Sequence, residues 1–121
     1  MIAGSVQNGQ AVVAVVYHIP GLGSISHDHV IDTGFSGDLT LPRDVVERLR
    51  LAYDRDQEIR LANDALDLVP VHLAMIEIGG NVREATVFST GNRPLFGTGL
   101  MEGKELVIQF VEGGMATLDD I

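Results

Sequence analysis

The chain has 121 residues, with 17 acidic against 8 basic side chains, and it contains no cysteine. A net charge of −9 argues against nucleic acid or an anionic membrane as a partner, because both select for clustered Lys and Arg. The lack of cysteine excludes disulfides, zinc–thiolate sites and a cysteine nucleophile. The length suits one domain, which we expect to span residues 1–121.

Targeting and cofactor patterns are not found in the sequence. The first ten residues carry no Lys or Arg, and the longest apolar run, residues 11–17, is too short to span a bilayer. The sequence has no G-x-S-x-G elbow, no phosphate-binding glycine loop and no H-E-x-x-H. We therefore expect a cytoplasmic protein with no membrane association and no cofactor.

The first part of the chain is predicted to form strands joined by turns, because Val, Ile and Leu dominate its apolar residues and glycines punctuate them. Residues 5–10 have the composition of a polar turn. A buried strand at residues 11–17 and a return strand at residues 25–31 should follow. Residues 32–37 contain two glycines and are predicted to be a loop, and residues 39–41 a short strand.

One helix is clear, and we predict it over residues 42–50. Proline is favoured at the first helical position, since its missing N–H has no intrahelical acceptor there. Val45, Val46 and Leu49 share one face of this segment, whereas its charged residues point outward.

The rest of the chain again predicts strands and tight turns, with an acidic end at residues 118–121 that should fray. Turns are expected at Asn63-Asp64, Gly79-Gly80 and Gly113-Gly114, and a loop at residues 90–94. The predicted strands are residues 57–61, 66–78, 82–89, 106–111 and 115–118. The fold class is therefore all-β with one or two short helices.

The motif that carries chemistry is Val30-Ile31-Asp32-Thr33-Gly34. Two apolar residues at the end of a buried strand would hold the Asp32 carboxylate rigidly. Gly34 has no side chain, so backbone amides and substrate can approach the loop closely. Thr33 offers a hydroxyl that can both donate and accept hydrogen bonds.

This motif, extended by Phe35-Ser36-Gly37 and followed by a short strand and a proline, resembles the retropepsin-like aspartic peptidases, in particular their small single-domain bacterial members. A second segment, Leu95-Phe96-Gly97 followed by an apolar pair at residues 100–101, resembles the family's apolar-apolar-glycine signature. The resemblance covers residues 11–118. It implies a retropepsin-like acid-protease subunit that hydrolyses peptide bonds, with Asp32, Thr33 and Gly34 as its catalytic motif.

The resemblance also implies roles for residues outside that motif. Leu95, Phe96 and Gly97 should pass beneath the catalytic loop and support it. A hairpin tip that covers the substrate, the flap, should lie at Ala62, Asn63, Asp64 and Ala65, although a plain surface hairpin fits those residues nearly as well.

The chain departs from the viral members of the family in one respect. Viral retropepsins usually have Ala after D-T-G, and an Asp soon after it that pairs with an Arg following the later glycine. Phe35, Ser36 and Thr98 occupy those places here, so that ion pair is absent.

A single D-T-G predicts two chains. The mechanism needs two carboxylates that share a proton, and none of the other aspartates precedes Thr-Gly or Ser-Gly. A homodimer would supply the second Asp32 across a two-fold axis, with peptide or protein as substrate. The resemblance implies that each Thr33 bonds to the loop of the other chain.

Two alternatives stay open at this point. The same fold could serve as a dimerisation or peptide-binding module without catalysis. His27 and His29, with Asp28 between them, would share one face of a strand and could hold a metal together with His18 or His72. Histidines on a strand edge are more often solvated, so we predict no metal site.

Overall fold

The structure is a computed structural model that describes residues 1–60 and 63–121. Strands dominate it, which confirms the all-β prediction. In chain order the elements are β1 (Ile2–Gln7), β2 (Gln10–Ile19), β3 (Gly23–Ile31), β4 (Leu39–Leu41), α1 (Arg43–Leu49), β5 (Ala52–Arg60), β6 (Leu66–Ile78), β7 (Asn81–Ser89), β8 (Leu95–Phe96), the 3₁₀ helix η1 (Thr98–Leu100), β9 (Lys104–Ile108) and β10 (Met115–Asp120).

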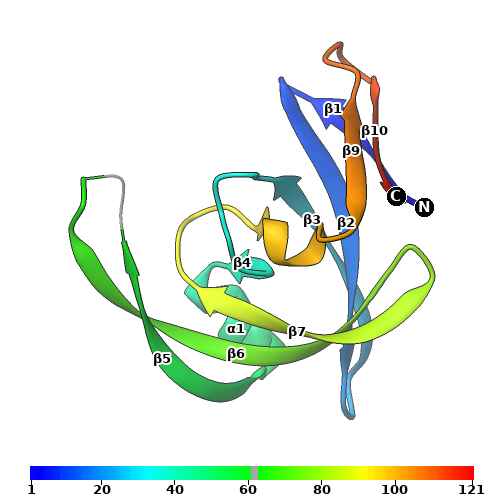
Figure 1. Ribbon diagram of the computed structural model, residues 1–121. Helices are drawn as coiled ribbons and strands as arrows, with labels where there is room; N and C mark the ends of the chain where they lie inside the picture. Colours follow the sequence, from blue (N-terminus) through cyan, green and yellow to red (C-terminus); the bar gives the residue numbers. More distant parts are fainter. Residues whose placement is uncertain (61–62) are drawn as a thin grey trace.

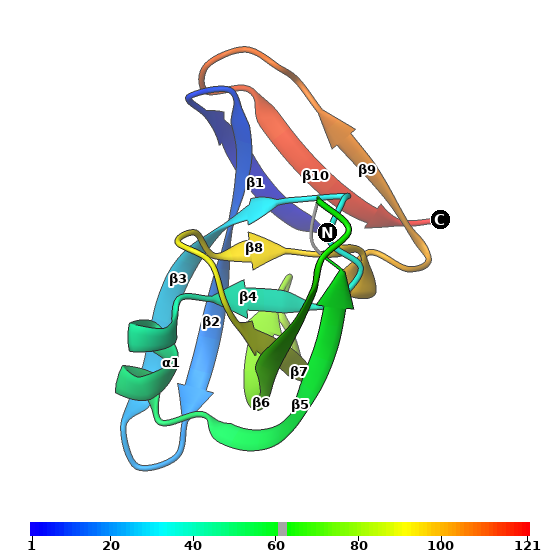
Figure 2. The same cartoon turned by 90° about the vertical axis from the view of Figure 1, so that its left-hand side faces the viewer.

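All of these strands belong to one sheet in the order β5-β6-β7-β4-β8-β3-β2-β1-β10-β9. The long strand β6 also pairs with β2, between Val16–His18 and Met75–Glu77, so the sheet closes partly on itself. In Figure 1, β5, β6 and β7 curve beneath the centre, while β1, β2, β9 and β10 stand at one side. Figure 2 shows the short strands β4 and β8 side by side in the middle, next to the end of β3.

The main core lies between these two groups of strands. Alternate residues of β2 from Ala11 to Ile19 are buried, as period-two side-chain alternation requires of a strand that covers a core. The helix contributes Val45, Val46 and Leu49 from one face, as the sequence predicted. A second cluster is separate from this core and consists of Val69, Val71 and Phe88, packed against Phe35 and Ile59.

The helix begins one residue later and ends one residue earlier than predicted. Pro42 has an extended ψ of 149° and is the residue before the first turn, not part of it. Arg50 has a left-handed φ of 53° and its N–H bonds back to Glu47 and Val46, which ends α1.

The prediction for the N-terminal segment was wrong. Residues 5–10 are not a turn, because β1 continues to Gln7 and β2 starts at Gln10. Only Asn8 and Gly9 turn, and their φ angles of 52° and 76° suit a two-residue hairpin. Only Ile2 and Val6 of this strand are buried, so its sequence lacks the alternating apolar residues that predict a strand.

The C-terminal prediction also needs correction. The acidic end does not fray, because Asp119 and Asp120 pair with Glu105 and Lys104 at the end of the β10–β9 ladder. Lys104 Nζ lies 2.6 Å from Asp120 Oδ1. Strand β9 covers Lys104–Ile108, so residues 109–111 belong to the turn and not to the strand.

The other predicted strands are found with modest shifts. Strand β5 starts at Ala52, five residues before the expected position, and Leu61 lies outside the described residues. The pair Leu95–Phe96, expected only as a supporting segment, forms the short strand β8.

Candidate active site

Asp32 follows the last residue of β3, and β8 fixes the backbone at that point. Val30 and Ile31 pair in parallel with Leu95 and Phe96. The Asp32 N–H donates to the Phe96 carbonyl at 2.9 Å, and the Val30 N–H donates to the Pro94 carbonyl at the same distance. The pairing with β8 therefore holds the start of the segment 32–38, which we call the Asp32 loop. The prediction that a buried strand ends here was wrong, because His29 is the only buried residue of β3.

The Asp32 side chain is half-buried and is oriented by its own loop. Its Oδ1 accepts the Gly34 N–H at 2.8 Å, and its carbonyl accepts the Phe35 N–H at 3.2 Å. A Cβ on Gly34 would lie 3.1 Å from that Oδ1, so glycine gives the carboxylate room to accept the amide. Thr33 and Gly34 are exposed beside it.

The segment 97–99 runs directly against the Asp32 loop. The Gly97 N–H donates to the Asp38 carbonyl at 2.8 Å, and the Gly99 N–H donates to the Gly37 carbonyl at 3.0 Å. A Cβ on Gly97 would overlap the Gly37 carbonyl oxygen and lie 2.5 Å from Phe35 Cδ2. The structure thus brings Leu95, Phe96 and Gly97 together with the Asp32 loop.

Thr98, the residue after Gly97, joins this segment to the Asp32 loop by two hydrogen bonds. Its N–H donates to the Phe35 carbonyl at 2.8 Å, and its hydroxyl donates to the same oxygen at 3.3 Å. A pair of neutral hydrogen bonds to one backbone oxygen therefore holds the segment 97–99 against the Asp32 loop.

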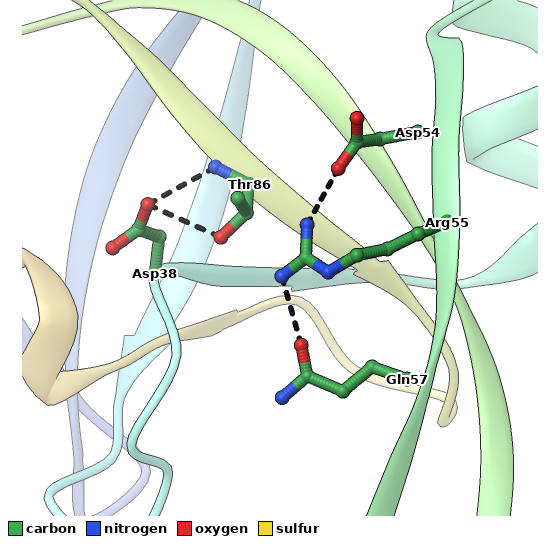
Figure 3. A network of polar contacts seen from close by, with 5 residues as sticks. All are labelled: Asp38, Asp54, Arg55, Gln57 and Thr86. Atoms are coloured by element: carbon green, nitrogen blue, oxygen red, sulfur yellow. Dashed lines mark hydrogen bonds and ion pairs between the residues drawn. The ribbon is translucent and has the colours of Figure 1, made fainter.

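Asp38 anchors the far end of the loop, a role that the sequence did not reveal. One oxygen of its carboxylate accepts both the N–H of Thr86 at 3.0 Å and its hydroxyl at 3.2 Å (Figure 3). Because Thr86 lies on β7, 48 residues away in sequence, no local sequence pattern predicts this contact.

Across from Asp38, Arg55 on β5 is held between two neighbours (Figure 3). Its guanidinium donates to Asp54 at 2.6 Å and to Gln57 at 2.8 Å. Arg55 and Gln57 line a pocket of about 480 Å³ together with residues 34–38 of the Asp32 loop, whereas Asp32 itself does not line it. Phe35 and Phe88, in edge-to-face contact at 5.4 Å, are also part of its wall.

The expected flap belongs to the β5–β6 hairpin, although Ala62 lies outside the described residues. Asn63, Asp64 and Ala65 are exposed in its turn. The Asn63 side-chain oxygen accepts the Ala65 N–H at 3.0 Å, and Asp64 has a φ of 64°. The turn character predicted for Asn63-Asp64 is therefore present.

Asp32 lines two other pockets, of about 290 and 310 Å³, and Arg93 and Leu95 line both of them as well. The second of them reaches Ile108 and Phe110 at the end of β9.

His29 on β3 makes hydrogen bonds inside the chain through both of its ring nitrogens. His29 is 1% exposed, and its Nε2 accepts the Tyr17 hydroxyl at 2.8 Å while its Nδ1 donates to the His27 carbonyl at 3.1 Å. Burial lowers the pKa of His29 to about 4, so it is neutral at pH 7. Residues 1–60 and 63–121 hold no group of three or more His, Cys, Asp or Glu placed to bind a metal.

The mostly-strand architecture, with one short helix, is that of a retropepsin-like all-β fold. The chain is similar in structure to a retropepsin-like aspartic protease from Rickettsia conorii, with a TM-score of 0.56. The likeness covers 96% of this chain and 88% of that chain at 15% sequence identity, so it shows the fold alone. No protein-family model matches the sequence, and no curated protein sequence matches it.

Within the described part of the chain, no helix combines the length and apolar character needed to cross a bilayer.

Proposed function

We propose that the chain is an aspartic endopeptidase that works as a homodimer, each subunit supplying Asp32. The observation that carries the proposal is the fixed, half-exposed carboxylate on a loop braced from both ends. Its backbone is tied to Phe96 at one end and, through Asp38, to Thr86 at the other. Such rigidity suits a group that must be in position before the reaction begins.

The chemistry requires a second carboxylate beside the first. In contact, two carboxyl groups share one proton, so that one activates water as a base and the other, protonated, donates a hydrogen bond to the scissile carbonyl. The water then attacks the carbonyl carbon, and the proton passes to the leaving nitrogen as the C–N bond breaks. Because the sequence has one D-T-G, the second carboxylate is assigned to another copy.

Peptide would lie between the Asp32 loop and the β5–β6 hairpin. The pocket of about 480 Å³ at this place combines apolar walls with the donors of Arg55 and Gln57. In this proposal residues 62–65 act as the flap, and Leu95, Phe96 and Gly97 support the loop. A cytoplasmic location is part of the same proposal, supported by the lack of cysteine.

The test compares the wild-type chain with Asp32→Asn on a mixture of unfolded peptides, with new chain ends identified by mass spectrometry. We expect internal cleavage by the wild type and none by the variant, because an amide cannot act as the base. Cleavage that persists in Asp32→Asn would exclude this site. A wild-type dimer that binds peptides without cutting them would favour the alternative, a peptide-binding module.

A further inference from the structure

The turn between β9 and β10 carries apolar side chains into solvent. Phe110 is 69% exposed and Val111 is 66% exposed, and they are neighbours in sequence. Val107 and Met115, on the flanking strands, are also exposed, but the strand register sets them on the sheet face opposite to Ile108. We call Phe110 and Val111 the hairpin patch. Adjacent exposed apolar residues of this size on a protein surface are typical of an interaction site.

The hairpin patch is held rigidly by backbone hydrogen bonds. Within the turn, the Val111 N–H donates to the Gln109 carbonyl and the Gly114 N–H to the Val111 carbonyl, both at 2.8 Å. The turn is also joined to β1, since Val6 exchanges bonds of 2.9 Å with Gly113 and Gly114. A side chain displayed on such a turn loses little conformational freedom on binding, which favours its use as an anchor.

The hairpin patch borders Asp32. Phe110 and Ile108 line the same pocket of about 310 Å³ as Asp32, Leu95 and Arg93. In Figure 1 the turn between β9 and β10 lies on the same side of the molecule as the end of β3, where Asp32 follows. A partner that covers Phe110 would therefore lie close to Asp32.

The sheet ends beside the hairpin patch. Strand β9 is the last in the order, so among the described strands its outer edge has no partner. The terminal strands are not available in the same way, because β1 lies between β2 and β10, and β10 between β1 and β9. An open edge is the part of a sheet that accepts another strand.

We propose that the hairpin patch and the outer edge of β9 bind a second copy of this chain, with Phe110 as the anchor. This inference rests on the proposed function, which leaves the site incomplete in one chain. An isologous contact sets the same patch on both subunits against each other around a two-fold axis. Since the hairpin patch borders Asp32, that axis brings the two carboxylates together. Screening of the net charge of −9 on each chain should make the dimer tighter in higher salt.

The first test is sedimentation of the full chain over a range of concentrations. Phe110→Glu is compared with wild type and with Leu22→Glu, which adds the same charge at an apolar residue 57% exposed on the β2–β3 turn, at the other end of β3 from Asp32. We expect Phe110→Glu to raise the dimer dissociation constant at least about thirtyfold, the effect of losing a strong anchor. Leu22→Glu should leave it unchanged. Circular dichroism verifies the fold, and Val111→Glu replaces Phe110→Glu should the latter unfold.

The second test uses the absence of cysteine in the sequence. Asp32→Cys supplies the only thiol of each chain, and a short bifunctional thiol reagent should link two copies. The same chain with Phe110→Glu should link far more slowly, and neither measurement depends on catalysis.

The outcomes separate the two proposals. A wild-type monomer at all concentrations, or a Phe110→Glu dimer as tight as wild type, overturns the assignment of the interface. Efficient linking through position 32 in the Phe110→Glu chain keeps the shared site but excludes this surface. A dimer that is sensitive to Phe110→Glu but never linked at position 32 supports the interface, and counts against the proposed catalytic pair.

Discussion

Replacing Gly97 by alanine adds one methyl group where the segment 97–99 crosses the Asp32 loop. The φ of −98° and ψ of 175° at Gly97 are ordinary extended values, so alanine meets no backbone strain there. Loss of glycine flexibility in the unfolded chain would by itself stabilise the protein by roughly 0.4–1 kcal/mol. The sign of the effect is therefore decided by the space around the new methyl group.

That space is already filled. The methyl carbon would overlap the Gly37 carbonyl oxygen and lie 2.7 Å from the Phe35 carbonyl oxygen. Both oxygens accept hydrogen bonds, from Gly99 and Thr98, so the loop cannot move away without weakening them. Overpacking costs about 1–3 kcal/mol, and contact with fixed backbone puts Gly97 at the upper end. After the gain in the unfolded state, we expect a net loss of about 2 kcal/mol, and more for Gly97→Val.

Urea unfolding followed by circular dichroism measures this loss as a lower midpoint with an unchanged slope. Gly91→Ala is the control, because its Cβ would meet no atom within 4 Å while its φ of 77° imposes a backbone cost of about 1 kcal/mol. Gly97→Ala should also reduce peptide cleavage, whereas Gly91→Ala should not. A Gly97→Ala chain as stable and as active as wild type would refute the crossing of these two segments.

Three further predictions concern catalysis, the loop and acid stability. A threefold excess of Asp32→Asn over wild type should lower activity to about a quarter once subunits exchange, because heterodimers hold one acid; full retained activity would contradict a shared site. A double-mutant cycle of Phe35→Leu and Phe88→Leu should give a coupling of about 1 kcal/mol from their edge-to-face contact, and additive effects would contradict it. Lowering the pH from 6.5 to 4 should reduce the free energy of unfolding by about 3 kcal/mol through His29, and His29→Gln should remove most of that slope in urea unfolding.

The position of Asp32 could be predicted from local sequence. Two apolar residues end strand β3, and Asp-Thr-Gly begins the loop that follows, so each step depends on neighbours in the chain. The support from Leu95 and Phe96 could be found only through the resemblance to a family. Their parallel pairing with Val30 and Ile31 joins segments 65 positions apart, and no periodicity encodes such a contact.

The features that the sequence missed are those decided by tertiary contacts. Strand β1 has two buried residues, Ile2 and Val6, and is specified mainly by pairing with β2 and β10. Nothing in the sequence around Asp38 indicates its role, because its partner Thr86 lies on β7 and reaches it only in the folded chain. Phe35 carries no visible sign that it joins the Asp32 loop to the cluster under the β5–β6 hairpin.

The buried His29 links the stability of the fold to pH. His29 must stay neutral in the fold, because desolvation by burial lowers its pKa from 6.5 to about 4. Below pH 6.5 the unfolded chain therefore binds a proton that the folded chain does not, and stability falls until about pH 4. At about 1.36 kcal/mol per pH unit this amounts to about 3 kcal/mol.

His72, whose pKa burial also lowers, adds to the loss in the same direction. Stability from these histidines is complete above pH 6.5 and falls as the pH drops below it. In the proposed enzyme, acid unfolding through His29 should therefore set the lower pH limit of activity. Because His29→Gln cannot titrate, it should extend activity per folded chain to lower pH than wild type. An acid limit that stays unchanged in His29→Gln would assign that limit to the carboxylate pair.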